Sequence, residues 1–119
     1  MFDLNRDVVN KSDLESKIAE GGDRLVAIHF YAKKPTNMMR CSLGTMGKHY
    51  KDRLLIVHAN ADALGQDVLE EYANTRQAPA FSFLRGGKKL SALQGENEED
   101  YILAIYKHMN SESLSRFLG

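Results

Sequence analysis

The chain has 119 residues and a hydrophobic share of 43%, which is enough for one domain with a packed core. Its 16 basic and 16 acidic residues cancel to a net charge of zero, so the sequence lacks the basic face or stripe of a nucleic-acid-binding protein. No stretch approaches the roughly 18 apolar residues of a membrane span, and the charged N-terminal residues do not resemble a signal peptide. We therefore expect a cytoplasmic protein, with the nucleus as an open alternative, that binds neither nucleic acid nor a membrane.

Cys41 is the single cysteine. One thiol cannot close a loop within its own chain, which excludes a secreted domain held together by disulfides. We therefore expect the protein in a reducing compartment. On a helix, Cys41 falls about 160° away from the neighbouring apolar positions. Two interpretations stay open: an unreactive small side chain, or an exposed thiol that forms a mixed disulfide.

The N-terminal segment predicts one short helix. Ser12 and Glu15 fit a capping box, in which each side chain satisfies a backbone N–H group of the first turn, so we expect the helix to open at Ser12. The pair Gly21–Gly22 is expected to end it. Before this helix, Val8–Val9 favours a brief edge strand.

Two nearly unbroken apolar runs, 25–32 and 54–59, are typical of strands that are buried on both faces of a sheet. Apolar residues at helical spacing between these runs predict a helix over 36–50. A further helix is expected around 68–72.

The C-terminal part predicts a β-hairpin and a closing helix. Strands at 81–84 and 90–93 flank a turn at Gly86–Gly87, and the closing helix follows from about Asn97. Residues 110–119 are expected to form a polar tail. Three apolar residues in it have the spacing of one helix face: Leu114, Phe117 and Leu118. The order of elements indicates a mixed sheet that is covered on both faces.

Five segments of the chain form a further pattern. They are Gly22–Val26 leading to Phe30–Ala32, Gln66–Val68, Ala78–Leu84, Gly86–Leu90 and Gly95–Glu99. In this order and at these spacings they resemble the thioredoxin family, and its animal cytosolic type more than its bacterial type. The resemblance runs from about residue 8 to residue 109. It implies a thioredoxin fold over residues 1–109, an α/β domain with a mixed central sheet of four to five strands flanked by four helices.

The chain departs from this family at the redox motif. The family has Cys-Gly-Pro-Cys where this chain has Lys33-Lys34-Pro35-Thr36, and the surrounding segment is two residues shorter here. A deletion before the motif aligns Lys33 and Thr36 with the cysteines, whereas a deletion inside the helix aligns Pro35 and Met38. We prefer the first register, because shortening a loop costs little and removing two helical residues rotates all that follows by roughly 200°. Neither register supplies a cysteine, so we expect no disulfide-exchange enzyme.

His29 and His58 occupy the positions where the resemblance implies a buried acid and its partner lysine. We expect a buried, neutral, hydrogen-bonded pair, with pKa values that burial lowers. The alternative is a metal site, but zinc needs at least a third protein ligand. No carboxylate is obviously placed to supply it, since Asp62 is only nearby in sequence. We expect neither a metal nor a cofactor.

The resemblance also implies a peptide groove beside Pro79. In the family the corresponding proline is cis, and the residue before it, Ala78 here, offers backbone groups to an extended segment, which binds by strand addition. The residues implied for the groove are Lys33, Lys34, Pro35, Thr36, Ala78, Pro79 and Gly95. The alternative is that Pro79 only shapes the start of its strand.

These observations favour a redox-inactive adaptor that binds a protein or peptide partner within a larger assembly, because the fold is kept while its chemistry is lost. The segment 110–119 is a candidate second contact, and a homodimer stays open. The alternative function is a monothiol oxidoreductase or redox sensor that uses Cys41. A storage or structural protein without a specific partner is a third hypothesis.

Overall fold

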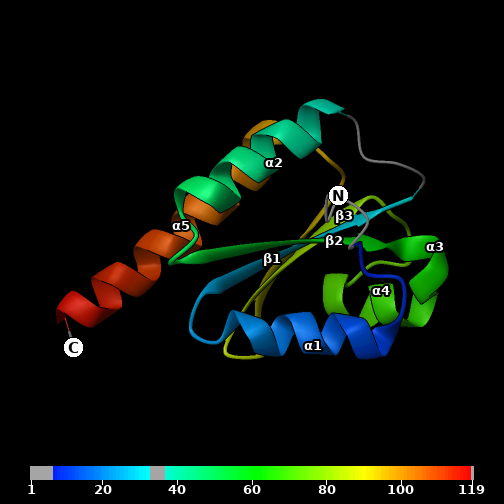
Figure 1. Ribbon diagram of the computed structural model, residues 1–119, viewed down its shortest axis with the longest axis horizontal. Helices are drawn as coiled ribbons and strands as arrows, with labels where there is room; N and C mark the ends of the chain where they lie inside the picture. The colour runs from blue at the N-terminus through cyan, green and yellow to red at the C-terminus, as the bar shows by residue number, and fades with distance from the viewer. Residues whose placement is uncertain (1–6, 33–36, 119) are drawn as a thin grey trace.

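The computed structural model describes residues 7–32 and 37–118, which form four strands and five helices (Figure 1). The bounds of the elements are α1 (Lys11–Gly21), β1 (Leu25–Tyr31), α2 (Asn37–His49), β2 (Leu54–Asn60), α3 (Ala61–Leu64), α4 (Gln66–Ala73), β3 (Ala80–Arg85), β4 (Lys88–Gln94) and α5 (Glu98–Leu118).

The sheet is mixed and has the strand order β2-β1-β3-β4. β1 pairs in parallel with β2 and antiparallel with β3, and β3 forms the expected hairpin with β4. The predicted N-terminal edge strand is reduced to one parallel bridge between Val8 and Ala59. The helix expected around 68–72 is α4, and the short helix α3 before it was not expected. Gly65, which has a positive φ of 98°, separates the two helices.

The start of α1 differs from the prediction. The N-cap is Asn10, not Ser12, and its side chain accepts a hydrogen bond of 2.8 Å from the backbone N–H of Asp13. Asparagine and serine are equally good N-caps, so the capping box was a plausible but wrong choice between two neighbouring signals. The end of the helix was predicted correctly, because Gly22 follows it with a φ of 57°.

The core lies in two layers, one on each face of the sheet. β1 is buried along its whole length, as the apolar run predicted. One layer packs β1 and β2 against α1 and α4, and the other packs them against α2 and α5 (Figure 1). Leu25 and Ala27 of β1 and Leu54 of β2 belong to the layer beneath α2 and α5. Because side chains alternate along a strand, His29 and His58 face the same layer.

The closing helix is longer than expected. Its backbone continues without a break through Leu118, so residues 110–118 are helical, and Figure 1 shows these last turns extending past the sheet. The side chains of Leu114, Phe117 and Leu118 lie outside the described part of the chain. In the described residues, no helix is both long enough and apolar enough to cross a membrane.

His108 anchors α5 to the hairpin at the end of the sheet far from His29. Its Nε2 lies 2.8 Å from the Ser91 hydroxyl, and its backbone carbonyl accepts a hydrogen bond of 3.1 Å from Arg85. Burial lowers the pKa of His108, and the positive charges of Lys107 and Arg85 lower it further.

This lowered pKa predicts a pH dependence of stability. The unfolded chain binds a proton at His108 with a pKa of about 6.5, before the folded chain does, so the contribution of His108 is present above that pH and declines below it. Denaturant midpoints measured from pH 8 to 5 should therefore fall less steeply in His108→Gln than in the unmodified protein. His49→Gln, which changes an exposed histidine of α2, is the control. Equal slopes for the unmodified protein and His108→Gln would contradict the assignment.

Candidate functional site

The candidate site lies where the C-terminal ends of β1 and β2 meet the segment before β3 and the loop before α5. The strand register places His29 directly beside His58. The Gly95 N–H donates a hydrogen bond of 2.8 Å to the carbonyl of Pro79, which joins the loop to the start of β3. Of the predicted groove residues, the structure therefore brings Ala78, Pro79 and Gly95 together. Residues 33–36, the other members, lie outside the described part.

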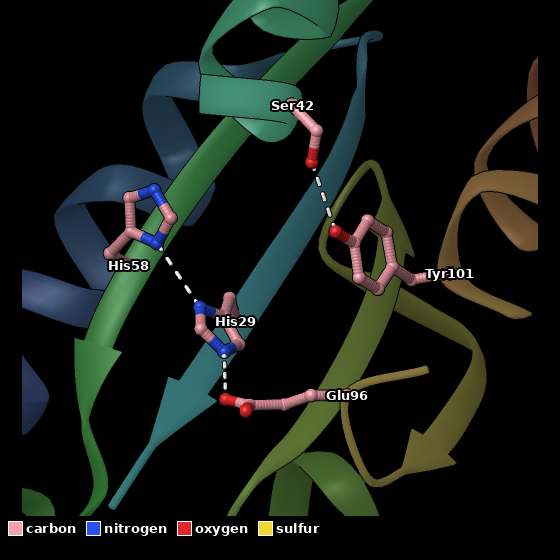
Figure 2. A network of polar contacts seen from close by, with 5 residues as sticks. All are labelled: His29, Ser42, His58, Glu96 and Tyr101. Carbon is pink, nitrogen blue, oxygen red and sulfur yellow. Dashed lines mark hydrogen bonds and ion pairs between the residues drawn. The ribbon is translucent and has the colours of Figure 1, made fainter. Parts of the chain in front are cut away.

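His29 is the centre of a polar network beneath α2 (Figure 2). It is completely buried, and its ring stacks on Phe81 with 4.8 Å between the ring centroids. Its Nε2 lies 2.8 Å from a carboxylate oxygen of Glu96, and its Nδ1 lies 3.2 Å from Nδ1 of His58. Both ring nitrogens of this buried imidazole are thus in polar contact.

These contacts determine where the protons lie. The Glu96 carboxylate can only accept, so the Nε2 of His29 carries a hydrogen. Between the two Nδ1 atoms, one must donate and the other accept. If both rings are neutral, His58 donates and His29 accepts. If His29 gains a proton, the direction reverses and the Glu96 carboxylate stabilises the positive charge. A second added proton would place two N–H groups against each other, so this geometry suits one shared proton.

The presence of Glu96 corrects the sequence interpretation. The pair was predicted to be neutral with no acid placed beside it, but the acid comes from the loop, 67 residues away from His29 in sequence. A nearby carboxylate opposes the effect of burial on an imidazole, so the lowering of the pKa that was expected from burial alone does not follow. No periodic or local motif pointed to Glu96. The resemblance of Gly95–Glu99 to the family's glycine loop was the one signal that placed it near the site.

The network is not arranged as a metal site. In the described residues, no three His, Cys, Asp or Glu side chains are grouped so that they could hold a metal ion. Asp62, the carboxylate considered from the sequence, lines a different hollow.

The segment before β3 presents open backbone. The Ala78–Pro79 peptide bond is cis. Within the described residues, the N–H and C=O of Ala78 have no hydrogen-bond partner. Ala78 lines a hollow of about 420 Å³, together with residues of α3, α4 and the segment that precedes Ala78. We call this the Ala78 hollow.

Cys41, the candidate thiol, lies on α2 after the first turn of the helix. Its side chain lies outside the described part of the chain. The backbone nevertheless places it away from the first residues of α2, where unpaired N–H groups activate thiols.

Comparison with known proteins identifies the family. The family model for thioredoxin matches residues 6–108. The chain belongs to the thioredoxin family. Thioredoxin-T from Drosophila melanogaster is 32% identical over 103 residues, which are 85% of this chain and 64% of that relative. The chain thus spans less than two thirds of the length of Thioredoxin-T. Thioredoxin-1 from Drosophila yakuba is 26% identical over 89 residues, covering 73% of this chain and 81% of that relative.

Solved structures confirm the predicted thioredoxin fold. The germline-specific thioredoxin protein Deadhead from Drosophila melanogaster superimposes with a TM-score of 0.72 at 23% identity, covering 85% of this chain and 96% of that one. Fasciola hepatica thioredoxin gives a TM-score of 0.69 at 22% identity over the same shares. With one cysteine in its whole sequence, this thioredoxin-family chain cannot form the disulfide within one chain that Cys-Gly-Pro-Cys provides.

The contact between Glu96 and His29 should contribute measurably to stability. Glu96→Ala leaves the buried Nε2–H of His29 without its acceptor, which should cost about 1–2 kcal/mol of unfolding free energy. The matched control, Glu99→Ala, removes an exposed carboxylate from the first turn of α5 and should cost less. In a His29→Phe background the cost of Glu96→Ala should fall to that of the control. An equal cost in both backgrounds, measured by urea denaturation, would show that the contact does not stabilise the fold.

Proposed function

We propose that this chain is a redox-inactive thioredoxin-like protein that binds a protein or peptide partner as an adaptor. Two observations together support the proposal: the loss of the redox cysteines and the open backbone groups at Ala78. The chain has the family's fold but a single cysteine, and the backbone groups of Ala78 have no hydrogen-bond partner among the described residues. Disulfide exchange needs a second thiol to resolve the mixed disulfide, and this chain does not supply one.

The geometry around Ala78 supports binding of an extended segment. Its N–H and C=O can pair with the backbone of a partner, which gives affinity without requiring a particular sequence. The adjoining Ala78 hollow offers space for a side chain of that partner. Its rim carries Asp62, Gln66 and Gln77, all exposed, which can hydrogen-bond to a bound segment.

The described part of the groove, at Pro79 and Gly95, would be ordered before a partner arrives. The hydrogen bond from Gly95 to Pro79 and the contact of Glu96 with His29 hold the loop against the sheet at two successive residues. A loop that is already ordered loses less conformational entropy when it binds. This supports a binding role for a site that has lost its catalytic sulfurs.

Insulin reduction tests the absence of redox activity. The chain should not accelerate the reduction of insulin by dithiothreitol, and Cys41→Ser should behave identically, because no second thiol resolves a mixed disulfide. A conventional thioredoxin serves as the positive control. Turnover that disappears in Cys41→Ser would overturn the proposal in favour of the monothiol alternative.

Peptide selection tests the groove. Peptides selected from a random-sequence display library for binding to the intact chain should bind at least tenfold more weakly to Gln77→Trp, because the indole would fill the Ala78 hollow. The control is Lys88→Trp, which adds the same ring at the exposed β-hairpin and should leave binding unchanged. Selected peptides that bind Gln77→Trp as tightly as the unmodified chain would refute this location.

A further inference from the structure

A second hollow lies at the end of the sheet where β1 begins and β3 ends. It is bordered by α1, α4 and the turn between β3 and β4, and Figure 1 shows that turn beside the C-terminal end of α1. Its volume is about 380 Å³, and its lining shares no residue with that of the Ala78 hollow. The apolar walls are Ile18 and Ala19 of α1 and the ring of Tyr72 of α4. We call this the Tyr72 hollow.

The described residues next to the undescribed segments lie at the other end of the sheet. Asp7, which follows residues 1–6, accepts a hydrogen bond of 2.8 Å from the hydroxyl of Tyr31 at the end of β1. Val8 pairs with Ala59 on the outer edge of β2, whereas the turn between β3 and β4 lies toward the opposite edge of the sheet. Ala32, which precedes residues 33–36, lines the Ala78 hollow. The surroundings of the Tyr72 hollow are therefore defined by described residues.

The lining of the hollow carries one negative charge and several free hydrogen-bond acceptors. Glu15 is the single charged residue among those that line it. Its carboxylate is exposed and forms neither an ion pair nor a hydrogen bond with any described residue. Gly22, Gly86 and Gly87 also line the hollow, and no described residue donates a hydrogen bond to their carbonyl oxygens. A carboxylate and unpaired carbonyls together suit a ligand that is cationic and rich in N–H donors.

The neighbouring lysines are engaged elsewhere or face away. Lys11, one turn before Glu15 on α1, forms an ion pair of 3.2 Å with Glu71. Lys89 donates a hydrogen bond of 3.1 Å to the backbone carbonyl of Glu71. Because side chains alternate along β4, Lys88 points to the other face of the sheet. The charge of Glu15 is therefore left for a cation that comes from another molecule.

Tyr72 adds an aromatic surface beside this charge. The residue is half-buried, and its backbone carbonyl accepts a hydrogen bond of 2.6 Å from the hydroxyl of the buried Ser82, which fixes it on the sheet. Burial raises the pKa of Tyr72, and the carboxylates of Glu71 and Glu15 raise it further, more than Lys11 lowers it. The phenol therefore stays neutral in a negative local field. A neutral aromatic ring next to a carboxylate is a favourable place for a guanidinium group, which stacks on the ring and pairs with the acid.

We propose that the Tyr72 hollow binds an arginine side chain of a partner protein. The aliphatic stem of the arginine packs on Ile18 and Ala19, and its guanidinium lies against the ring of Tyr72 and pairs with Glu15. Arginine fits this lining better than lysine, because its planar group stacks on an aromatic ring and its five N–H donors can use several acceptors at once. This surface acts independently of the Ala78 hollow.

The test uses a synthetic peptide with one central arginine between glycine and serine residues. Titrated to millimolar concentration into the ¹⁵N-labelled intact chain, it should shift the amide signals of Ala19 and Gly87 and leave that of Ala78 in place. The same peptide with citrulline, which has the shape of arginine without its charge, should bind at least tenfold more weakly. A lysine peptide should also bind more weakly than the arginine peptide. Glu15→Lys should weaken binding of the arginine peptide at least tenfold, whereas the control Glu99→Lys makes the same charge change on α5 and should bind as the unmodified chain does.

Ala19→Trp provides a second, independent variant. Ala19 is exposed on α1, so the indole fills the hollow without entering the core, and it should weaken binding at least tenfold. The control Leu103→Trp places the same ring at an exposed position of α5 and should leave binding unchanged.

Four outcomes would overturn the proposal. They are equal binding by Glu15→Lys and Glu99→Lys, equal binding of the citrulline or lysine peptide, no binding of the arginine peptide at millimolar concentration, and a tenfold gain in affinity after deletion of residues 1–6. The last result would make the chain's own N-terminal segment the occupant. The Ala78 proposal would stand in each of these cases, since its readout is binding to Gln77→Trp.

Discussion

The burial of His29 between Glu96 and His58 is the constraint on which the arrangement of the site depends. A fully buried imidazole is costly unless both of its nitrogens have hydrogen-bond partners. Here one partner comes from the neighbouring strand and the other from a loop far away in sequence. The loop must therefore lie against the end of β1. The Gly95 N–H then reaches the carbonyl of Pro79, so one polar contact helps to shape the surface beside Ala78.

The network also reverses the distribution of charge that the family resemblance implies. The resemblance places an acid on the first strand of the pair and a base beside it, whereas this chain places bases at both positions and the acid on the loop. The acid and bases still satisfy one another, and Phe81 still packs against the central ring. The chain lacks the two cysteine sulfurs to and from which such an acid–base pair would transfer protons. The site is therefore best understood as a structural polar centre.

Local sequence patterns predict much of the fold but less of the candidate site. The unbroken apolar run at 25–32 predicted β1, because a strand covered on both faces needs apolar residues at successive positions. The choice of Asn10 over Ser12 as N-cap could not be predicted, since both residues satisfy the same requirement. Glu96 could not be predicted either, because its partner lies on a strand and nothing periodic connects the two positions. The role of His29 in the site could be assigned only after the fold had placed Glu96 beside it.

The Ala78 hollow and the His29 network lie on opposite faces of the sheet. Two residues that line the hollow, Ala61 and Leu69, belong to the core layer beneath α1 and α4. His29 faces the layer beneath α2 and α5, because side chains alternate along β1. Between the two layers β1 is buried along its whole length, so it has little freedom to move. The polar network can therefore hold the segment before β3 in place without filling the hollow that this segment lines.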